Sequence, residues 1–206
     1  MKNKTKMRIL LSILFGVAFT FSYSIVSKAD SYKLSAWYSD AEEGWVGYWE
    51  SNPNVFVRNL SSSIATHGYV SNAVSKWKTV GISSSVTTAQ SNANINFYGG
   101  TRSELIACGF YYDSGTAGLT YWDTSSFVAY ANGIAYEIYK LSAVSASVCA
   151  EASNPECVAL HEYGHAMGWY GHSPHGSDVM YKYENSVGTL TANDKAQLTQ
   201  IYNLMR

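Results

Sequence analysis

The spacing of hydrophobic residues divides the middle of the chain into strands and helices. Between residues 54 and 60, two valines alternate with other residues, which is typical of a strand. Over residues 65–80, apolar residues recur three and four positions apart, as they do on one face of a helix. Alternation returns at Ile95 and Phe97 and predicts another strand, and residues 86–89 also have strand character.

Three further strands are predicted before residue 142. Residues 118–122 have the composition of a strand that glycine bounds. Residues 127–130 and 134–141 predict a hairpin across residues 131–133, because Asn-Gly is a common hairpin turn. The second strand of this hairpin leads toward a helix.

That helix is predicted to start at Pro155, which suits the first helical position, with Asn154 as its N-cap. Gly168 can end it, since glycine adopts the left-handed conformation at little cost. A closing helix is predicted over residues 190–202, with Thr191 as its cap and an acid three residues later. Strands and helices in this order predict an α+β fold.

The N-terminus has the pattern of a secretory signal peptide, which we assign to residues 1–29. Four basic residues precede an apolar run over residues 9–26, and the small residues of Ser27-Lys28-Ala29 suit a cleavage site. A membrane anchor of similar length is the alternative, but no stop-transfer pattern follows. We therefore expect a secreted, extracellular protein with no stable membrane anchor after cleavage.

The length and net charge of the chain after residue 29 limit its domain number and its partners. Residues 30–206 suit one domain, of which the aromatic, irregular residues 30–53 form an N-terminal extension. Removing the signal leaves nine basic and 15 acidic residues, a net charge of −6. A mildly acidic exported protein is a poor candidate for binding nucleic acid, so we expect no nucleic-acid partner. Nothing in the sequence identifies an oligomer, and we expect a monomer.

Residues 161–172 carry the pattern with the clearest chemistry. His161 and His165 are four residues apart, so on a helix they project from one face and can bind one zinc ion. Glu162 lies beside them, within reach of a water on the metal. After Gly168 the chain can turn back and bring a third imidazole, for which His172 is favoured over His175.

This stretch resembles the metzincin zinc peptidases, whose helix reads H-E-x-x-H-x-x-G-x-x-H and is followed by a methionine turn. It is most similar to the matrixins, since Ser173 follows the third histidine and Met180-Tyr181 fits the methionine turn. One departure is that Gly171 stands where the family has its third histidine, and His172 comes one residue later. We interpret this as a one-residue insertion that Gly171 tolerates.

The resemblance implies a twisted mixed sheet, a long active-site helix, a methionine turn and a C-terminal helix. It also implies roles for particular residues. Met180 would form an apolar floor beneath the ligands, and Asp194 would support the methionine turn. An edge strand containing Gly118, Leu119 and Thr120 would bind an extended substrate by strand addition, although an ordinary core strand is an equally good interpretation. Tyr181 would shape the pocket for the side chain after the cleaved bond.

The same resemblance implies a zinc endopeptidase that acts on protein or peptide substrates and is released from a bacterial cell. Three neutral imidazoles leave zinc its full charge, so its water ionises near neutral pH, with Glu162 as general base. We expect one catalytic zinc ion; calcium is possible, but no sequence feature supports it. No cysteine precedes Cys108, so we expect this protein to be made without the cysteine-bearing pro-segment of the family.

Two other functions remain open. In a gluzincin-type peptidase, Glu184 would be the third ligand, but it lies in a loop-like stretch and leaves the third histidine without a role. The second alternative is an inactive exported binding protein. The retained Glu162 argues against it, because a non-catalytic zinc site does not need that acid.

The chain has three cysteines, an odd number for an exported protein. Cys149 and Cys157 flank a short loop, and we predict a disulfide between them that tethers the catalytic helix, with Cys108 buried or free. Cys157 as a fourth zinc ligand is the alternative, but its sulfur would close the site.

Overall fold

The structure is a computed structural model that describes residues 8–12, 46–131 and 134–205. Its elements, in chain order, are β1 (Arg8–Ser12), β2 (Val46–Tyr48), β3 (Asn54–Asn59), α1 (Thr66–Trp77), β4 (Ser85–Thr87), the 3-10 helix η1 (Gln90–Asn92), β5 (Ile95–Gly100), α2 (Arg102–Ala107), β6 (Gly118–Ala131), β7 (Ile134–Cys149), α3 (Pro155–Ala166) and α4 (Ala192–Leu204). The predicted α+β fold is confirmed.

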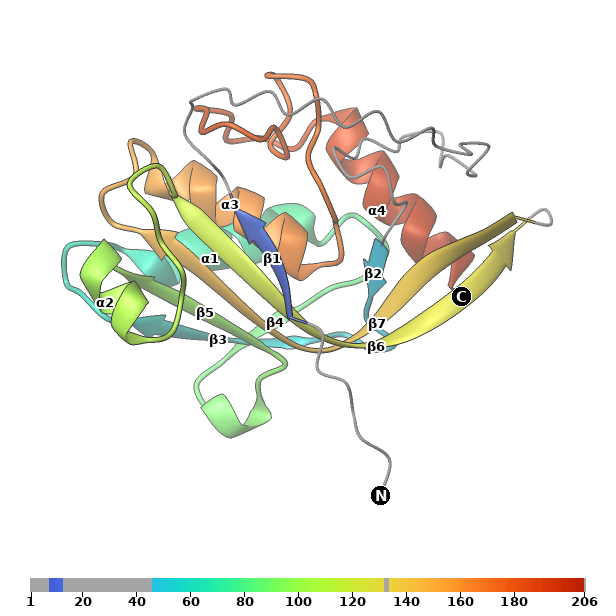
Figure 1. The fold of residues 1–206 in the computed structure, drawn as a ribbon, viewed down its shortest axis with the longest axis horizontal. Helices are drawn as coiled ribbons and strands as arrows, with labels where there is room; N and C mark the ends of the chain where they lie inside the picture. The colour runs from blue at the N-terminus through green and yellow to red at the C-terminus, as the bar shows by residue number, and fades with distance from the viewer. Residues whose placement is uncertain (1–7, 13–45, 132–133, 206) are drawn as a thin grey trace.

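The strands of the described residues form one mixed sheet in the order β1-β6-β7-β5-β3-β4, with β2 also pairing with β7. The pairs β1–β6 and β6–β7 are antiparallel, and the other pairs are parallel. β6 and β7 are the longest strands and extend as a twisted ribbon past the rest of the sheet (Figure 1). The twisted mixed sheet implied by the resemblance is therefore present.

Helices α1, α3 and α4 lie over one face of the sheet (Figure 1). The main hydrophobic core fills the space between this face and the helices, and its largest fully buried side chains include those of Trp77, Trp122, Trp169, Tyr163 and Tyr202. α3 packs against α1, β6 and β7 at once, and ten of its residues are buried. A helix surrounded in this way cannot shift without disturbing the whole core.

Three tryptophans fix the position of α3 through polar as well as apolar contacts. The indole N–H of each donates to a backbone carbonyl of this helix at 2.9 Å. The pairs are Trp49 with Ala166, Trp77 with Leu160 and Trp122 with His165. A buried indole N–H needs an acceptor. These bonds therefore fix the position of α3 along its own axis as well as its distance from the sheet.

A second, smaller cluster lies on the opposite face of the sheet. Successive strand residues point to opposite faces, and β6 follows this rule: Trp122 belongs to the main core, whereas Leu119 packs in the second cluster. Leu105 of α2 and Cys149 at the end of β7 complete this cluster together with Phe110 and Tyr112. Side chains of the two clusters are thus separated by the sheet.

The N-terminal caps of α3 and α4 agree with the sequence predictions. α3 begins at Pro155, and the Asn154 side chain accepts a hydrogen bond from the Cys157 N–H. α4 has the predicted capping box, in which Thr191 and Asp194 each accept from the other's backbone N–H. α1 ends at Trp77, somewhat earlier than its hydrophobic spacing predicts.

Other elements differ from the predictions. The separate strands expected at residues 118–122 and 127–130 are one strand, β6, with a register shift between Asp123 and Thr124. α2 was not predicted. β2 lies within the expected N-terminal extension, but it pairs with β7 and is buried, so residues 46–48 belong to the core. The Asn132-Gly133 turn lies outside the described residues.

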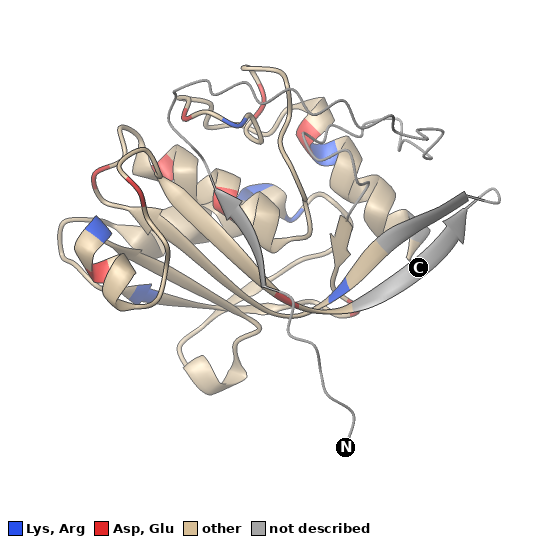
Figure 2. Ribbon diagram, in the orientation of Figure 1, with Lys and Arg blue, Asp and Glu red and all other residues tan. Residues whose placement is uncertain are grey.

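Most of the predicted signal peptide, residues 1–29, also lies outside the described residues. Its described part, β1, pairs antiparallel with residues 119–123 of β6. No helix in the described part of the chain has the length and apolar character needed to cross a membrane. Charged residues are few and dispersed along the described ribbon (Figure 2).

Candidate metal centre

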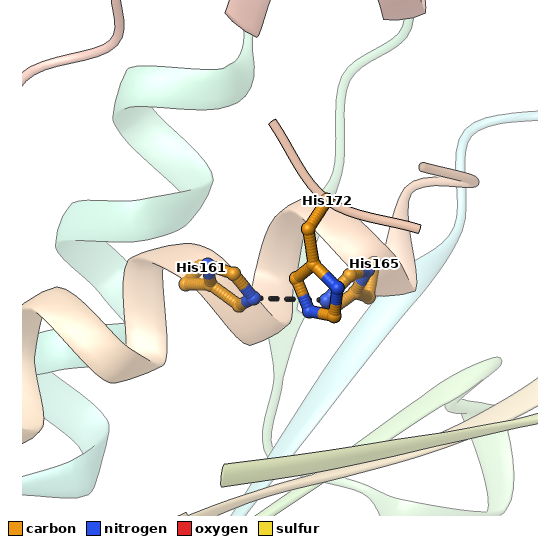
Figure 3. A group of neighbouring side chains, drawn as sticks. All are labelled: His161, His165 and His172. Carbon is orange, nitrogen blue, oxygen red and sulfur yellow. Dashed lines mark hydrogen bonds between the residues drawn. The ribbon is translucent and has the colours of Figure 1, made fainter. Parts of the chain in front are cut away.

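The structure brings together the three histidines that the sequence singles out. His161 and His165 project from one face of α3, and His172 reaches them from the loop that follows the helix (Figure 3). One ring nitrogen from each histidine lies within 4.8 Å of the other two. Within the described ranges, this is the group of metal-ligating side chains close enough to share one ion.

Backbone carbonyls set the tautomers of the two helical histidines. Nδ1 of His161 lies 2.7 Å from the carbonyl oxygen of Val179, and Nδ1 of His165 lies 2.9 Å from that of Trp169. A carbonyl oxygen can only accept, so each Nδ1 carries the proton and each Nε2 presents a lone pair. These Nε2 atoms are only 2.9 Å apart. Two lone pairs at this distance repel unless a cation lies between them, so the donor set fits a shared metal ion.

The imidazoles are held in the neutral form that metal binding requires. Burial lowers the pKa of His161 to about 4 and the pKa of His172 to about 3. Burial also lowers the pKa of His165 well below its usual value, and the two neighbouring histidines lower it further. His161 and His165 are 3 % and 0 % exposed, so solvent does not compete for their ring nitrogens.

The loop after α3 delivers His172 rather than His175. Gly171 has a φ of 74°, a left-handed conformation that a residue with a side chain rarely adopts. The His172 ring then lies 5.3 Å from the His161 ring and 5.1 Å from the His165 ring, between centroids. His175 is exposed to solvent. The carboxylate of Glu184 accepts from the Asn154 N–H at the start of α3, and among the described residues it is not part of the group of side chains that could share one ion.

The methionine turn, residues 177–181, lies directly beneath the metal site. Met180 is fully buried, and its sulfur packs so closely against Gly164 of α3 that a methyl group there would overlap it. Asp194 is also fully buried, and its carboxylate accepts from the N–H groups of Val179 and Met180 at 3.0 and 3.1 Å. The structure thus places Met180 as a floor and ties its backbone to α4.

Sequence reasoning missed a second clamp on this turn. The carboxylate of Asp178 is fully buried and accepts from the hydroxyls of Ser173 and Thr191 at 2.6 and 2.7 Å. The Ser173 N–H donates to the Met180 carbonyl at 2.7 Å. Ser173 directly follows His172, so these bonds attach the third histidine to the methionine turn. The sequence signal that could have revealed this clamp is an acidic residue, Asp178, two positions before Met180.

Glu162 lies next to the metal site with its carboxylate fully buried. Its Oε2 accepts from the Thr120 hydroxyl at 2.7 Å, whereas Oε1 has no hydrogen-bond partner among the described residues. Burial raises the pKa of Glu162 well above its usual value, and the Thr120 hydroxyl opposes this. A cation at the imidazoles would lower that pKa by favouring the carboxylate. The arrangement is that of a base with one fixed oxygen and one available oxygen.

The residues predicted to bind substrate lie on β6 and at the end of the methionine turn. Leu119 packs in the second cluster, and Thr120 points to Glu162, so neither side chain lines an open pocket. The backbone of residues 119–123, however, pairs with an extended segment, β1. Tyr181 is half-buried, but Tyr183 rather than Tyr181 lines the small cavity beside His161.

The predicted disulfide between Cys149 and Cys157 is wrong for this structure, in which all three cysteines are free thiols. Cys149 packs in the cluster on the outer face of the sheet, whereas Cys157 lies on α3 over the inner face. The Cys149 thiol instead donates to the carboxylate of Glu151 at 2.8 Å. Proximity in sequence misled the prediction, because the sheet separates the two side chains. Cys108 is exposed.

Comparison with known proteins identifies a family. No curated protein matches the chain. The family model described as Matrixin matches residues 59–203, a span that includes α3, the three histidines and the methionine turn. Matrixins are zinc-dependent peptidases. Since the match covers well over half of the sequence, the chain belongs to the matrixin family.

Proposed function

We propose that this protein is an exported zinc endopeptidase that hydrolyses peptide bonds in protein substrates, with Glu162 as general base. The observation that carries the proposal is the convergence of three neutral imidazoles beside a buried carboxylate that has one oxygen without a protein partner. A structural zinc site needs the imidazoles, but it has no use for the carboxylate. The carboxylate favours catalysis over an inactive binding protein, and the convergence of three imidazoles favours His172 over Glu184 as the third ligand.

In the proposed mechanism, His161, His165 and His172 hold the zinc ion. The bound ion would supply Lewis-acid chemistry, which lowers the pKa of water and polarises the scissile carbonyl. Oε1 of Glu162 takes the proton of the attacking water and later delivers it to the leaving amine. The buried position of Glu162 excludes bulk water from this proton transfer, and Met180 holds the histidine-bearing turn of α3 from below.

The edge of β6 is the proposed binding surface for substrate. Residues 119–123 already accept an extended antiparallel segment through backbone hydrogen bonds, and Thr120 of this stretch contacts Glu162. A peptide bound by strand addition would therefore run past the catalytic carboxylate. The cavity of about 10 Å³ beside His161 holds no more than one water, so a substrate side chain could enter it only if the cavity opened.

Export is proposed from the sequence of residues 1–29, with cleavage before Asp30. Mass spectrometry of the protein recovered from the culture medium tests it directly, since the mature N-terminus should be Asp30. Recovery only of cell-associated protein with residues 1–29 intact would contradict export.

The test of the catalytic proposal measures zinc content and casein cleavage on the same samples. The wild type should bind one zinc per chain and cleave casein; Glu162→Gln should keep the zinc and lose cleavage. His172→Ala should weaken both, whereas His175→Ala, an exposed control from the same loop, should change neither.

Two outcomes would favour the alternatives. Loss of zinc in Glu184→Ala, with His172→Ala unaffected, would indicate the gluzincin ligand set. Zinc binding without cleavage in the wild type would indicate a binding protein.

A further inference from the structure

Thr120 makes a contact that substrate binding does not explain. Its side chain is fully buried, and its hydroxyl lies 2.7 Å from Oε2 and 3.2 Å from the backbone carbonyl oxygen of Glu162. Among the described residues, this hydroxyl is the donor that reaches the Glu162 carboxylate. The strand that borders the site therefore contacts the proposed general base.

The need for such a donor follows from the chemistry of a glutamate side chain. Its terminal torsion is broad and roughly two-fold, so packing alone does not fix the plane of the carboxylate. The χ1 of threonine is restricted by its branched Cβ, and Thr120 lies in a stretch of β6 that is paired with β7. A hydroxyl held in this way can fix the orientation of the carboxylate.

Gly118 completes the support from the same strand. It lies two residues before Thr120 and so faces the same side of the sheet. A Cβ at position 118 would come within 2.6 Å of both Cγ and Oε1 of Glu162. The absence of a side chain at Gly118 leaves room for Oε1, while Thr120 holds Oε2.

We propose that Thr120 is a positioning residue: it binds Oε2 of Glu162 and thereby directs Oε1 toward the reacting water. This inference rests on the proposed peptidase function. It assigns different roles to the two carboxylate oxygens, one structural and one for proton transfer. It also assigns Thr120 to the support of the base rather than to side-chain contact with substrate.

The kinetic test removes the hydroxyl while keeping the shape of the side chain. Thr120→Val should lower kcat by roughly 10- to 100-fold, as expected when a catalytic group loses its orientation. KM and zinc content should stay within about two-fold of the wild type, because the Thr120 side chain contacts neither substrate nor metal and its backbone is unchanged by the substitution. Thr120→Ser should keep most of the wild-type kcat. Thr120→Ala also removes the hydroxyl and should lower kcat by a similar factor, so it replaces the valine variant if valine impairs folding.

Thr66→Val is the matched control. Thr66 is also fully buried, but it lies at the start of α1, and its hydroxyl has no partner among the described residues. It should keep the wild-type kcat. A Thr120→Val variant with wild-type kcat would overturn the proposal, and so would a Thr120→Ser variant as impaired as Thr120→Val, since that would assign the effect to packing.

Crystal structures of the metal-free wild type and Thr120→Val provide a readout that does not depend on activity. The Glu162 carboxylate should be ordered with Oε2 on Thr120 in the wild type, and rotated or disordered in the variant. An unchanged carboxylate in the variant would overturn the positioning role. If the zinc-loaded wild type cleaves no peptide, the proposed function fails, but this comparison still decides whether Thr120 orients Glu162.

Discussion

Replacing Asp194 with alanine should show how strongly the methionine turn depends on α4. The Asp194 carboxylate accepts from the backbone N–H of Thr191 at 2.8 Å, as part of the helix cap, and from the N–H groups of Val179 and Met180. It is fully buried, so water does not readily replace it. Asp194→Ala therefore removes a helix cap and leaves two further buried N–H groups without an acceptor.

The chain offers a matched control for the cap itself. Glu104 closes the capping box of α2 in the same way, accepting from the N–H and hydroxyl of Thr101 at 2.8 and 2.7 Å. Loss of such a cap costs about 1 kcal/mol. Each buried donor left without a partner adds about 1–3 kcal/mol. We expect Glu104→Ala to cost about 1 kcal/mol and Asp194→Ala roughly 3–7 kcal/mol, a large part of the stability of a small domain.

Urea unfolding of the two variants and the wild type, all without metal, measures this difference. Asp194→Ala should also bind zinc more weakly, because Val179 holds Nδ1 of His161 through its carbonyl. Equal losses of unfolding free energy in the two variants would refute the reasoning. That result would mean that the bonds to Val179 and Met180 add nothing beyond an ordinary cap.

Two further predictions concern the base and the histidines. Gly118→Ala should lower kcat by about 100-fold, because its methyl group displaces the Glu162 carboxylate; unchanged cleavage of casein would contradict this. In the metal-free protein, the folded state keeps His161 and His172 neutral to about pH 4 and 3, whereas the unfolded state protonates them below about 6.5. The free energy of unfolding should therefore fall as pH drops below 6.5, by up to about 1.4 kcal/mol per pH unit for each histidine. Glu162 has the opposite effect: its raised pKa makes the folded state take up one proton more readily than the unfolded state, which offsets part of the loss of unfolding free energy. Urea unfolding at pH 7.5 and 5 with a chelator measures the net loss, and equal stability at both values would refute it.

The helical part of the site was predictable because its signals are local. Asn154 and Pro155 define where α3 starts, and a four-residue spacing puts two histidines on one face of any helix. The capping box at Thr191 is equally local, since its bonds close within four residues. These features follow from the backbone geometry of a helix and need no knowledge of the rest of the fold.

Contacts between distant segments were harder to predict. The alternation of β6 indicates that Thr120 and Leu119 face opposite sides, but not that the side of Thr120 holds Glu162, 42 residues away. The expected disulfide failed for the same reason. Cys149 ends a strand and Cys157 lies in the first turn of a helix, and only the three-dimensional fold shows that the sheet lies between them.

The shifted third ligand shows how one extra residue can be accommodated. Counting from Gly168, His172 is one position later than in the family pattern, but its place is not set by counting from the helix. The next residue, Ser173, is bonded to Met180 and Asp178, so the loop is anchored at its far end by the methionine turn. Between the end of α3 and that anchor, the left-handed Gly171 absorbs the added length. The metal site therefore depends on the distance between two fixed points, α3 and Ser173, and a loop of either length can span it.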